Sequence, residues 1–237
     1  MRYNSKTGGP VMLKQISAGT KLYQKVSRKP DQRVAVVDVD DVLFPCTQII
    51  LNKLNQEHNK QVSLDDLKGY HVLSHFPEIG KDFQDLIAYL ISGHDYMNVP
   101  GVYDYAKPVL DLLRSRGFYI AIVSSRGFHP EGYRNTFNYF KKYSLPFDSL
   151  ATVGMGSSKI DFVYDHISSD IHLVIDDNAQ VIEESLESDA FVIKTKRAWN
   201  SHLVTHGTIE PDMDTCSVLD EVDGVLDRVL EDTYVNT

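Results

Sequence analysis

Apolar positions along this chain alternate between short continuous runs and segments with helical spacing. Runs of small, β-branched or aromatic residues, typical of buried parallel strands, occur at 34–37, 119–123, 150–153, 172–175 and 190–193. Helical spacing marks 104–116, 130–143, 157–167, the segment after Asn178 to about Glu187, and 218–230. Strands that alternate with helices predict an α/β fold, an open parallel sheet flanked by helices with right-handed crossovers.

A helical insert separates the first strand from the rest of this pattern. Helical spacing covers 47–59, a helix start with an acidic first turn lies at 63–66, and 81–91 is a second amphipathic segment. We therefore predict a core made of 34–44 and 101–237, with a small helical cap at 45–100 inserted after the first strand.

Residues 1–33 differ from the rest in composition. Breakers such as Gly8-Gly9-Pro10 predict mostly irregular structure, with a short strand at 11–16, and no phosphate-loop spacing occurs. The segment carries eight lysine or arginine residues and one acid, a net charge of +7, while the whole chain carries −9. Such a basic extension either folds back on the acidic body or contacts nucleic acid or another polyanion. The acidic body argues against extensive binding to a phosphate backbone.

Composition places the chain among ordinary globular proteins, with 42% hydrophobic and 24% charged residues. No apolar run is long enough to cross a membrane, and no apolar segment follows the charged N-terminus as in a secretory signal. Cys46 and Cys216 match no zinc or redox spacing. We expect a protein of a reducing, cytoplasmic setting with no membrane contact.

The first predicted strand ends in a cluster of acids, Asp38, Asp40 and Asp41. At ~4 Å and an effective dielectric constant of ~20, each pair of carboxylates repels by roughly 4 kcal/mol. A hard divalent cation with oxygen ligands offsets that repulsion. The alternative is an acidic turn that caps the next helix.

Other polar side chains follow the same pattern at strand ends and helix starts: Ser124 with Ser125 and Arg126, Lys159, and Asp176 with Asp177. The carboxyl ends of parallel strands and the N-termini of the following helices meet at one edge of a sheet, so we expect these side chains to converge. A lysine is unfavourable at a helix N-terminus, which indicates an anionic partner for Lys159.

Together these residues predict a phosphoryl-transfer site. Asp38 is the expected nucleophile, and Asp40 is the expected general acid and then base. Mg²⁺ is expected between Asp38, the main-chain oxygen of Asp40 and Asp177, with Asp176 as a further or indirect ligand. Ser124 and Lys159 are expected to bind phosphate oxygens, as are Ser125 and Arg126. A surface salt bridge is an equal alternative for Arg126.

The motifs resemble those of the haloacid dehalogenase (HAD) superfamily of Mg²⁺-dependent phosphatases. Asp38-Val39-Asp40-Asp41-Val42 is similar to its first motif, Ser124 to its second, Lys159 to its third, and Asp176-Asp177 to its fourth. The resemblance covers about residues 34–195 and implies a Rossmann-like core and Mg²⁺ as the cofactor. Asp41 departs from the family, which usually has glycine there; the extra acid either tunes the metal site or points to solvent.

Within the superfamily, Leu43-Phe44 and the segment 64–70 resemble the 5′(3′)-deoxyribonucleotidase group. This resemblance implies hydrolysis of a nucleoside monophosphate. Ser124-Ser125-Arg126 and Ile175-Asp176-Asp177 also resemble the phosphatase domain of polynucleotide kinases, which implies nucleic-acid ends as an alternative substrate. Other small-molecule phosphates, and a catalytically silent binding protein with the same fold, are further alternatives.

The sequence assigns no firm role to several further residues. Aromatic faces hold nucleobases well, so a substrate pocket is a hypothesis for some aromatic residues, against the alternative of core packing. These residues are Phe44, Phe76, Tyr96 and Tyr103. Trp199-Asn200 either closes the site from the side or belongs to a packed loop. The sequence does not decide which base and sugar the substrate carries, which of its phosphates is cleaved, or whether the protein is a homodimer.

Overall fold

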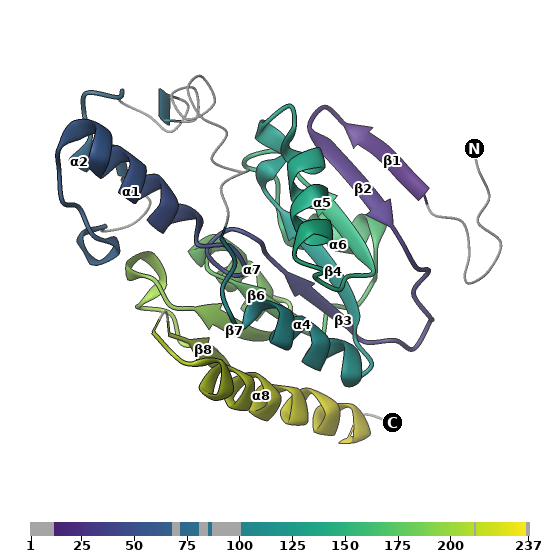
Figure 1. The fold of residues 1–237 in the computed structure, drawn as a ribbon. Coiled ribbons are helices and arrows are strands. Elements are labelled where there is room, and N and C mark those ends of the chain that lie inside the picture. Colours follow the sequence, from purple (N-terminus) through teal and green to yellow (C-terminus); the bar gives the residue numbers. More distant parts are fainter. Residues whose placement is uncertain (1–11, 68–71, 81–84, 87–100, 211, 236–237) are drawn as a thin grey trace.

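The computed structural model describes residues 12–67, 72–80, 85–86, 101–210 and 212–235. Its centre is an eight-stranded sheet with the order β1-β2-β5-β4-β3-β6-β7-β8 (Figure 1). The strands are β1 Met12–Ser17, β2 Thr20–Gln24, β3 Val34–Val37, β4 Tyr119–Ser124, β5 Ser149–Thr152, β6 Leu173–Asp176, β7 Phe191–Thr195 and β8 Gly207–Ile209. The six strands from β3 to β8 run parallel, so the predicted α/β architecture with an open Rossmann-like sheet is confirmed.

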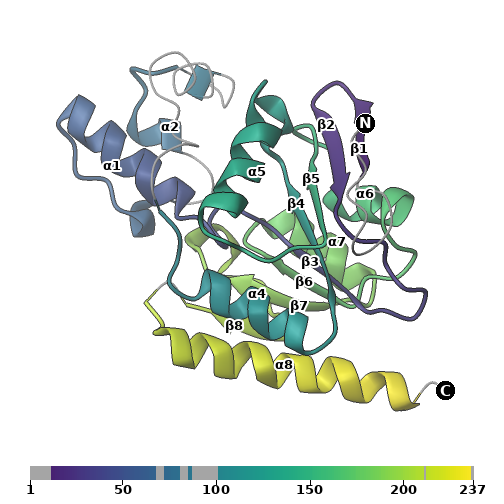
Figure 2. The same ribbon diagram turned by 45° about the vertical axis from the view of Figure 1, so that its right-hand side comes forward.

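Helices cover both faces of the sheet (Figures 1 and 2). The α-helices are α1 Cys46–His58, α2 Val72–His75, α4 Ala106–Ser115, α5 Gly132–Lys142, α6 Lys159–His166, α7 Ala179–Glu187 and α8 Thr215–Val235. Apolar residues of α4, α5 and α8 pack in one core with one face of the strands. Those of α6 and α7 pack in a second core with the other face. Because β3 lies between these two cores, all four of its side chains are buried, as its continuous apolar run predicts.

The order of the strands reverses at β3. The chain passes from β3 to β4 and β5 on one side, and then returns to β6 on the other side of β3. Ligands of open α/β sheets bind outside the carboxyl ends of the strands at such a point. The loop that follows β3 therefore occupies the position where a ligand site is expected.

The predicted cap region begins directly after this loop. Helix α1 is followed by the 3₁₀ helix Leu64–Asp66, which Ser63 begins, and by α2. In Figures 1 and 2, α1 and α2 lie together, away from the sheet. The amphipathic segment predicted at 81–91 lies almost wholly outside the described residues, and the division into core and cap stays a prediction.

An antiparallel hairpin at the N-terminus extends the sheet. The sequence predicts one strand in the extension 1–33, but residues 12–24 form two, and β2 pairs antiparallel with β5. The alternating side chains of β2 explain this pairing, because Leu22 is buried in one core while the ring of Tyr23 lies 5.3 Å from that of Phe137 on the opposite face. Among the described helices, none is long and apolar enough to cross a membrane.

Candidate active site

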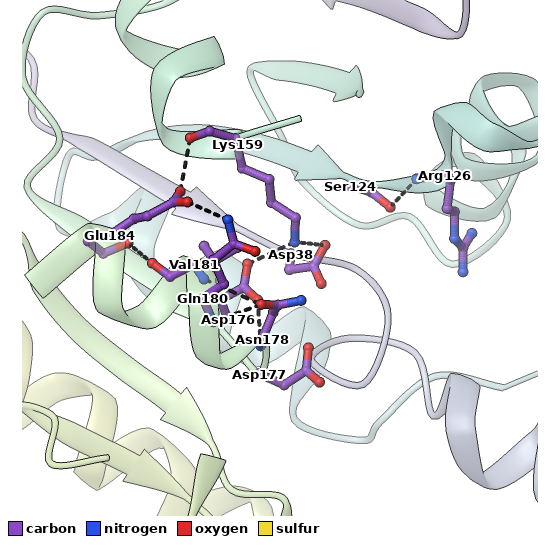
Figure 3. A network of polar contacts seen from close by, with 12 residues as sticks. Asp38, Ser124, Arg126, Lys159, Asp176, Asp177, Asn178, Gln180, Val181 and Glu184 are labelled. Carbon is purple, nitrogen blue, oxygen red and sulfur yellow. Dashed lines mark hydrogen bonds and ion pairs between the residues drawn. The ribbon is translucent and has the colours of Figure 1, made fainter. Parts of the chain in front are cut away.

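Asp38 follows β3 directly and lies beside a buried lysine (Figure 3). The Nζ atom of Lys159 is 2.9 Å from Asp38 Oδ1 and 2.9 Å from Asp176 Oδ2. Lys159 is the first residue of α6. The preceding residue, Ser158, caps this helix, because its hydroxyl accepts a hydrogen bond from the Asp161 N–H. The helix predicted at 157–167 therefore begins slightly later than its sequence pattern indicates. Burial alone would lower the pKa of Lys159, but the carboxylates of Asp176 and Asp38 raise it well above its usual range.

Three buried carboxylates at this edge are close enough to share one cation. Asp38, Asp176 and Asp177 each offer an oxygen, and these oxygens lie within 4.8 Å of one another. If all three were ionised, the carboxylates beside one lysine would leave two negative charges unbalanced. Burial raises the pKa of Asp38 to about 7, and the charges of Asp176 and Asp40 add to this effect. A divalent cation with oxygen ligands would correct that imbalance, so these residues fit Mg²⁺.

Two residues beyond β7 hold Asp177 in place. Trp199 Nε1 donates to Asp177 Oδ2 and to its main-chain oxygen, both at 3.1 Å. Asn200 Nδ2 donates to the same main-chain oxygen at 2.7 Å and to Thr195 O at 2.9 Å. The sequence suggested that Trp199-Asn200 closes the site or packs in a loop. Both side chains are buried and orient an acid of the cluster, a role that their sequence position alone did not indicate.

Asp40 is paired with Arg126 rather than with the acid cluster. Arg126 Nε donates to Asp40 Oδ2 at 2.8 Å, and Nη2 donates to Oδ1 at 2.6 Å. Burial would raise the pKa of Asp40, but the guanidinium outweighs it and lowers the pKa below its usual value. Arg126 is 1% exposed, so its pair is not the surface salt bridge that the sequence left open. Cys46 is a buried neighbour of Asp40, and burial raises the pKa of its thiol.

The predicted phosphate-binding serines lie on the strand beside β3. Ser124 is the last residue of β4, is fully buried, and its hydroxyl oxygen accepts from the Arg126 N–H at 3.4 Å. Ser125 is half-buried and precedes the 3₁₀ helix Arg126–Phe128. Figure 3 shows Ser124 and Arg126 next to each other, apart from the Lys159 cluster. All four predicted motifs lie at one edge of the sheet, in two groups: Asp38, Lys159, Asp176 and Asp177 form one, and Asp40, Ser124 and Arg126 form the other.

Asp41 has a structural position that neither expectation described. Its side chain is 3% exposed and accepts hydrogen bonds from the Thr47 N–H, at 3.0 Å, and from the Thr47 hydroxyl. It does not point to solvent, and it is not one of the three acids of the cluster. Its φ of 58° is left-handed, a conformation that glycine adopts readily, and glycine is the residue that the resemblance implies at this position. Asp41 thus caps α1, whose N-cap Pro45 has no side-chain acceptor.

Arg197 is a buried residue of this edge that the sequence analysis missed. Its Nη2 atom donates to Asp41 O at 2.7 Å and to the Tyr103 hydroxyl at 2.9 Å. The bond to Asp41 joins the loop after β7 to the loop after β3. An arginine two residues after a strand carries no motif of its own, so no pattern in the sequence identified it.

The hypothetical aromatic substrate pocket is not assembled by the described residues. Phe44 and Phe76 are fully buried in the core, and the Arg126 guanidinium lies 5.1 Å from the Phe44 ring centroid. Tyr103 is stacked on Tyr105 with centroids 5.1 Å apart. Tyr96 lies outside the described residues. Core packing, the alternative stated for these residues, accounts for Phe44 and Phe76.

Comparison with known proteins supports the assignment of the fold. No protein-family model and no curated protein sequence matches this chain. A haloacid dehalogenase-like hydrolase from Streptococcus pneumoniae has a similar structure, with a TM-score of 0.54, 14% identity, and coverage of 80% of this chain and 97% of that one. A predicted phosphatase from Clostridium acetobutylicum matches with a TM-score of 0.52, 17% identity, and coverage of 72% and 88%. The fold is that of the HAD hydrolases.

Proposed function

We propose that this protein is a Mg²⁺-dependent phosphatase that hydrolyses nucleoside monophosphates through Asp38. The observation that carries the proposal is the arrangement of Asp38, Asp176 and Asp177, whose oxygens lie within 4.8 Å of one another beside Lys159. Asp38, Asp176 and Asp177 would hold the cation, with the main-chain oxygen of Asp40 as a predicted further ligand. When bound, Mg²⁺ screens the negative charge of the nucleophile and of the phosphate from each other.

The protein's own residues supply the other steps. An oxygen of Asp38 attacks phosphorus, the ester P–O bond breaks, and the leaving oxygen takes a proton from the Asp40 carboxyl group. Asp40 then accepts a proton from water, whose oxygen attacks phosphorus and releases Asp38. The pair with Arg126 fixes the Asp40 carboxylate and favours its ionised form, which accepts the proton in the second step; the first step needs the protonated form, which this pair disfavours. Lys159 and Ser124 supply a positive charge and a hydroxyl for phosphate oxygens.

One structural observation favours a second class of substrate, nucleic-acid ends. The basic N-terminal segment forms a hairpin whose strand β2 pairs with β5, next to the strand that carries Ser124. This position favours a substrate that extends past the scissile phosphate, such as a phosphorylated nucleic-acid end. The mononucleotide proposal is supported by the resemblance of the first motif and of the insert that follows it.

The test is phosphate release from ribo- and deoxyribonucleoside monophosphates, sugar phosphates and a 3′-phosphorylated oligonucleotide. It compares wild type with Asp38→Asn, each in Mg²⁺ and in EDTA. We expect Mg²⁺-dependent release from mononucleotides that Asp38→Asn abolishes. Release from the oligonucleotide alone would assign end processing. No release from any ester by a folded protein would contradict a phosphatase and favour a binding protein.

A further inference from the structure

A cavity of about 330 Å³ lies between the N-terminal hairpin, the loop after Arg126 and the start of α5. The hairpin contributes Gln15 and Lys21, and the other walls include His129, Tyr133 and Thr152. No motif from the sequence analysis falls in this cavity, and the proposed chemistry does not use it. Phe128 and Pro130 add apolar surface, so the walls combine a cation, hydrogen-bonding groups and apolar contacts, a mixture that suits a ligand with an anionic group.

The strand register connects this cavity with the candidate active site. Gln15 pairs with Lys21 across β1 and β2, Lys21 pairs with Thr152 across β2 and β5, and Thr152 pairs with Ser124 across β5 and β4. Neighbouring strands are about 4.8 Å apart, so Lys21 stands roughly 10 Å from the backbone of Ser124. A continuous row of polar residues therefore leads from the predicted phosphate-binding serine into the cavity.

The polar groups of the cavity are only partly satisfied within the protein. Thr152 is fully buried, and its hydroxyl has no hydrogen-bond partner in the described part of the chain. Lys21 lies 5.8 Å from the Tyr133 ring centroid, and no carboxylate of the described residues pairs with it. His129 Nδ1 accepts from the Glu131 N–H at 3.0 Å, which leaves its Nε2 to carry the proton and to donate. A buried hydroxyl without a partner is costly unless a ligand completes it.

The wall of the cavity is tightly built where it meets the active-site loop. A Cβ atom added to Gly19 would lie 2.4 Å from the Gly127 oxygen, and one added to Gly127 would lie 2.4 Å from the Gly19 oxygen. The hairpin turn is therefore in backbone contact with the segment that follows Arg126. This contact fixes the position of Lys21 relative to Ser124.

We propose that this cavity binds a second phosphate group of the substrate, beyond the one that is hydrolysed. Lys21 supplies the positive charge, and Thr152 and His129 supply donors. The ligand is a nucleotide with two phosphates, which is either a nucleoside bisphosphate or the end of an oligonucleotide. This proposal rests on the proposed phosphatase function and narrows its substrate class.

The test compares kcat/KM for nucleoside 3′- and 5′-monophosphates, a nucleoside 3′,5′-bisphosphate and a 3′-phosphorylated dinucleotide. In wild type we expect the second phosphate to raise kcat/KM about tenfold, as one charge-assisted contact does. Lys21→Gln should remove this advantage and leave the monophosphates unchanged. The matched control is Lys14→Gln, because Lys14 pairs with Leu22 and so lies on the opposite face of the same hairpin. If only the bisphosphate shows the Lys21-dependent rise in kcat/KM, the ligand is a nucleoside bisphosphate; if only the dinucleotide shows it, the ligand is an oligonucleotide end.

The inference would be overturned by equal kcat/KM for substrates with one and with two phosphates. It would also be overturned if Lys14→Gln and Lys21→Gln lowered kcat/KM for the two-phosphate substrates equally. Thr152→Val gives an independent check, since it removes a hydroxyl that lacks a partner. We expect it to weaken binding of the dinucleotide severalfold without lowering the melting temperature. Unchanged binding in both Thr152→Val and Lys21→Gln would also overturn it.

Equilibrium binding of a labelled 3′-phosphorylated dinucleotide separates this inference from the proposed function. If no ester is hydrolysed but Lys21→Gln still weakens binding about tenfold, the phosphatase proposal fails and the second phosphate site stands. If esters are hydrolysed and neither binding nor kcat/KM depends on Lys21, the phosphatase proposal stands and this inference fails.

Discussion

Arg126 donates two hydrogen bonds to the carboxylate of Asp40, at 2.8 Å from Nε to Oδ2 and 2.6 Å from Nη2 to Oδ1. This fork joins the loop after β4 to the loop after β3. Because a planar guanidinium matches a carboxylate in both distance and direction, the pair fixes the orientation of Asp40 as well as its charge.

Arg126→Lys should therefore lower kcat about 100-fold with little change in KM, since a lysine keeps the charge but not the fork. Arg126→Gln should lower kcat similarly and also lower the free energy of unfolding by about 3 kcal/mol, because a buried ion pair loses one partner. Steady-state kinetics and urea denaturation measure the two effects. Full activity in Arg126→Lys would mean that Asp40 needs no positioning by this residue.

Mg²⁺ should stabilise the folded protein. A ligand at 100 times its Kd adds about 2.7 kcal/mol to the free energy of unfolding. We expect the melting temperature to rise with Mg²⁺ and to fall back with EDTA. Asp177→Asn should abolish this rise, whereas Asp165→Asn, an exposed acid on α6, should keep it. An equal rise in both variants would place the cation elsewhere.

Trp199→Phe should weaken Mg²⁺ binding while Asp177 itself is retained. Phenylalanine keeps most of the packing but removes the N–H that donates to Asp177 Oδ2 and to its main-chain oxygen. Residues that orient a metal ligand typically contribute roughly 10- to 100-fold to the affinity for the metal. A Mg²⁺ titration of the melting temperature measures the loss. An unchanged titration would show that Asn200 alone holds Asp177.

Two histidines should make the sheet sensitive to acid. His172 Nδ1 accepts from the Val34 N–H at 3.3 Å, and His206 Nδ1 accepts from the Val192 N–H at 3.0 Å. Burial lowers the pKa of both below the usual 6.5, helped by Arg33 beside His172 and Arg228 beside His206. The unfolded chain then binds more protons than the folded one near and below pH 6.5, so stability falls as the pH falls.

His172→Gln should reduce this pH dependence, because the glutamine amide oxygen can accept from the Val34 N–H at any pH. Urea denaturation of wild type and variant between pH 5 and 8 gives the comparison. We expect the two curves to lie closest at low pH, where wild type loses a hydrogen bond of about 1 kcal/mol. Parallel curves over the whole range would show that His172 does not contribute.

Substitutions of Asp41 should lower the free energy of unfolding according to two properties, the tolerance of a left-handed φ and the ability to accept the hydrogen bonds from Thr47. Asp41→Asn keeps an acceptor and tolerates a left-handed φ, so we expect a loss below about 1 kcal/mol. Asp41→Gly keeps the left-handed conformation but loses the hydrogen bonds to Thr47, so its loss should be intermediate. Asp41→Ala loses these hydrogen bonds and also strains the backbone, and should lower the free energy of unfolding by about 2 kcal/mol or more. Urea denaturation checks the order. A smaller loss in Ala than in Gly would contradict a backbone requirement at this position.

The parts of the fold that the sequence predicted are those where one pattern decides the structure. The run Val34–Val37 is apolar at every position, and a strand buried on both faces needs that pattern. The hairpin was predicted only in part, because Leu22 and Tyr23 face different cores and so give no continuous run. The three residues of β8 are too few to show a period.

The site was predicted as a set of residues but not as a set of contacts. Strand ends are readable in the sequence, so Asp38, Ser124 and Asp176 could be placed at one edge. Which charge pairs with which depends on side-chain direction across the loops, and no spacing predicts that Arg126 meets Asp40 while Lys159 spans two other acids. The contacts of Trp199 and Arg197 were missed for the same reason.

The pairing of β2 with β5 determines how the N-terminal segment can be studied. Removing residues 1–33 as though they were a detachable arm would leave β5 as an open edge strand, and unpaired edges invite other chains to add to the sheet. It would also expose apolar surface where Leu22 and Tyr23 pack. Shortened versions of the chain that begin at β3 should therefore aggregate, and a loss of activity in them would say nothing about substrate contacts.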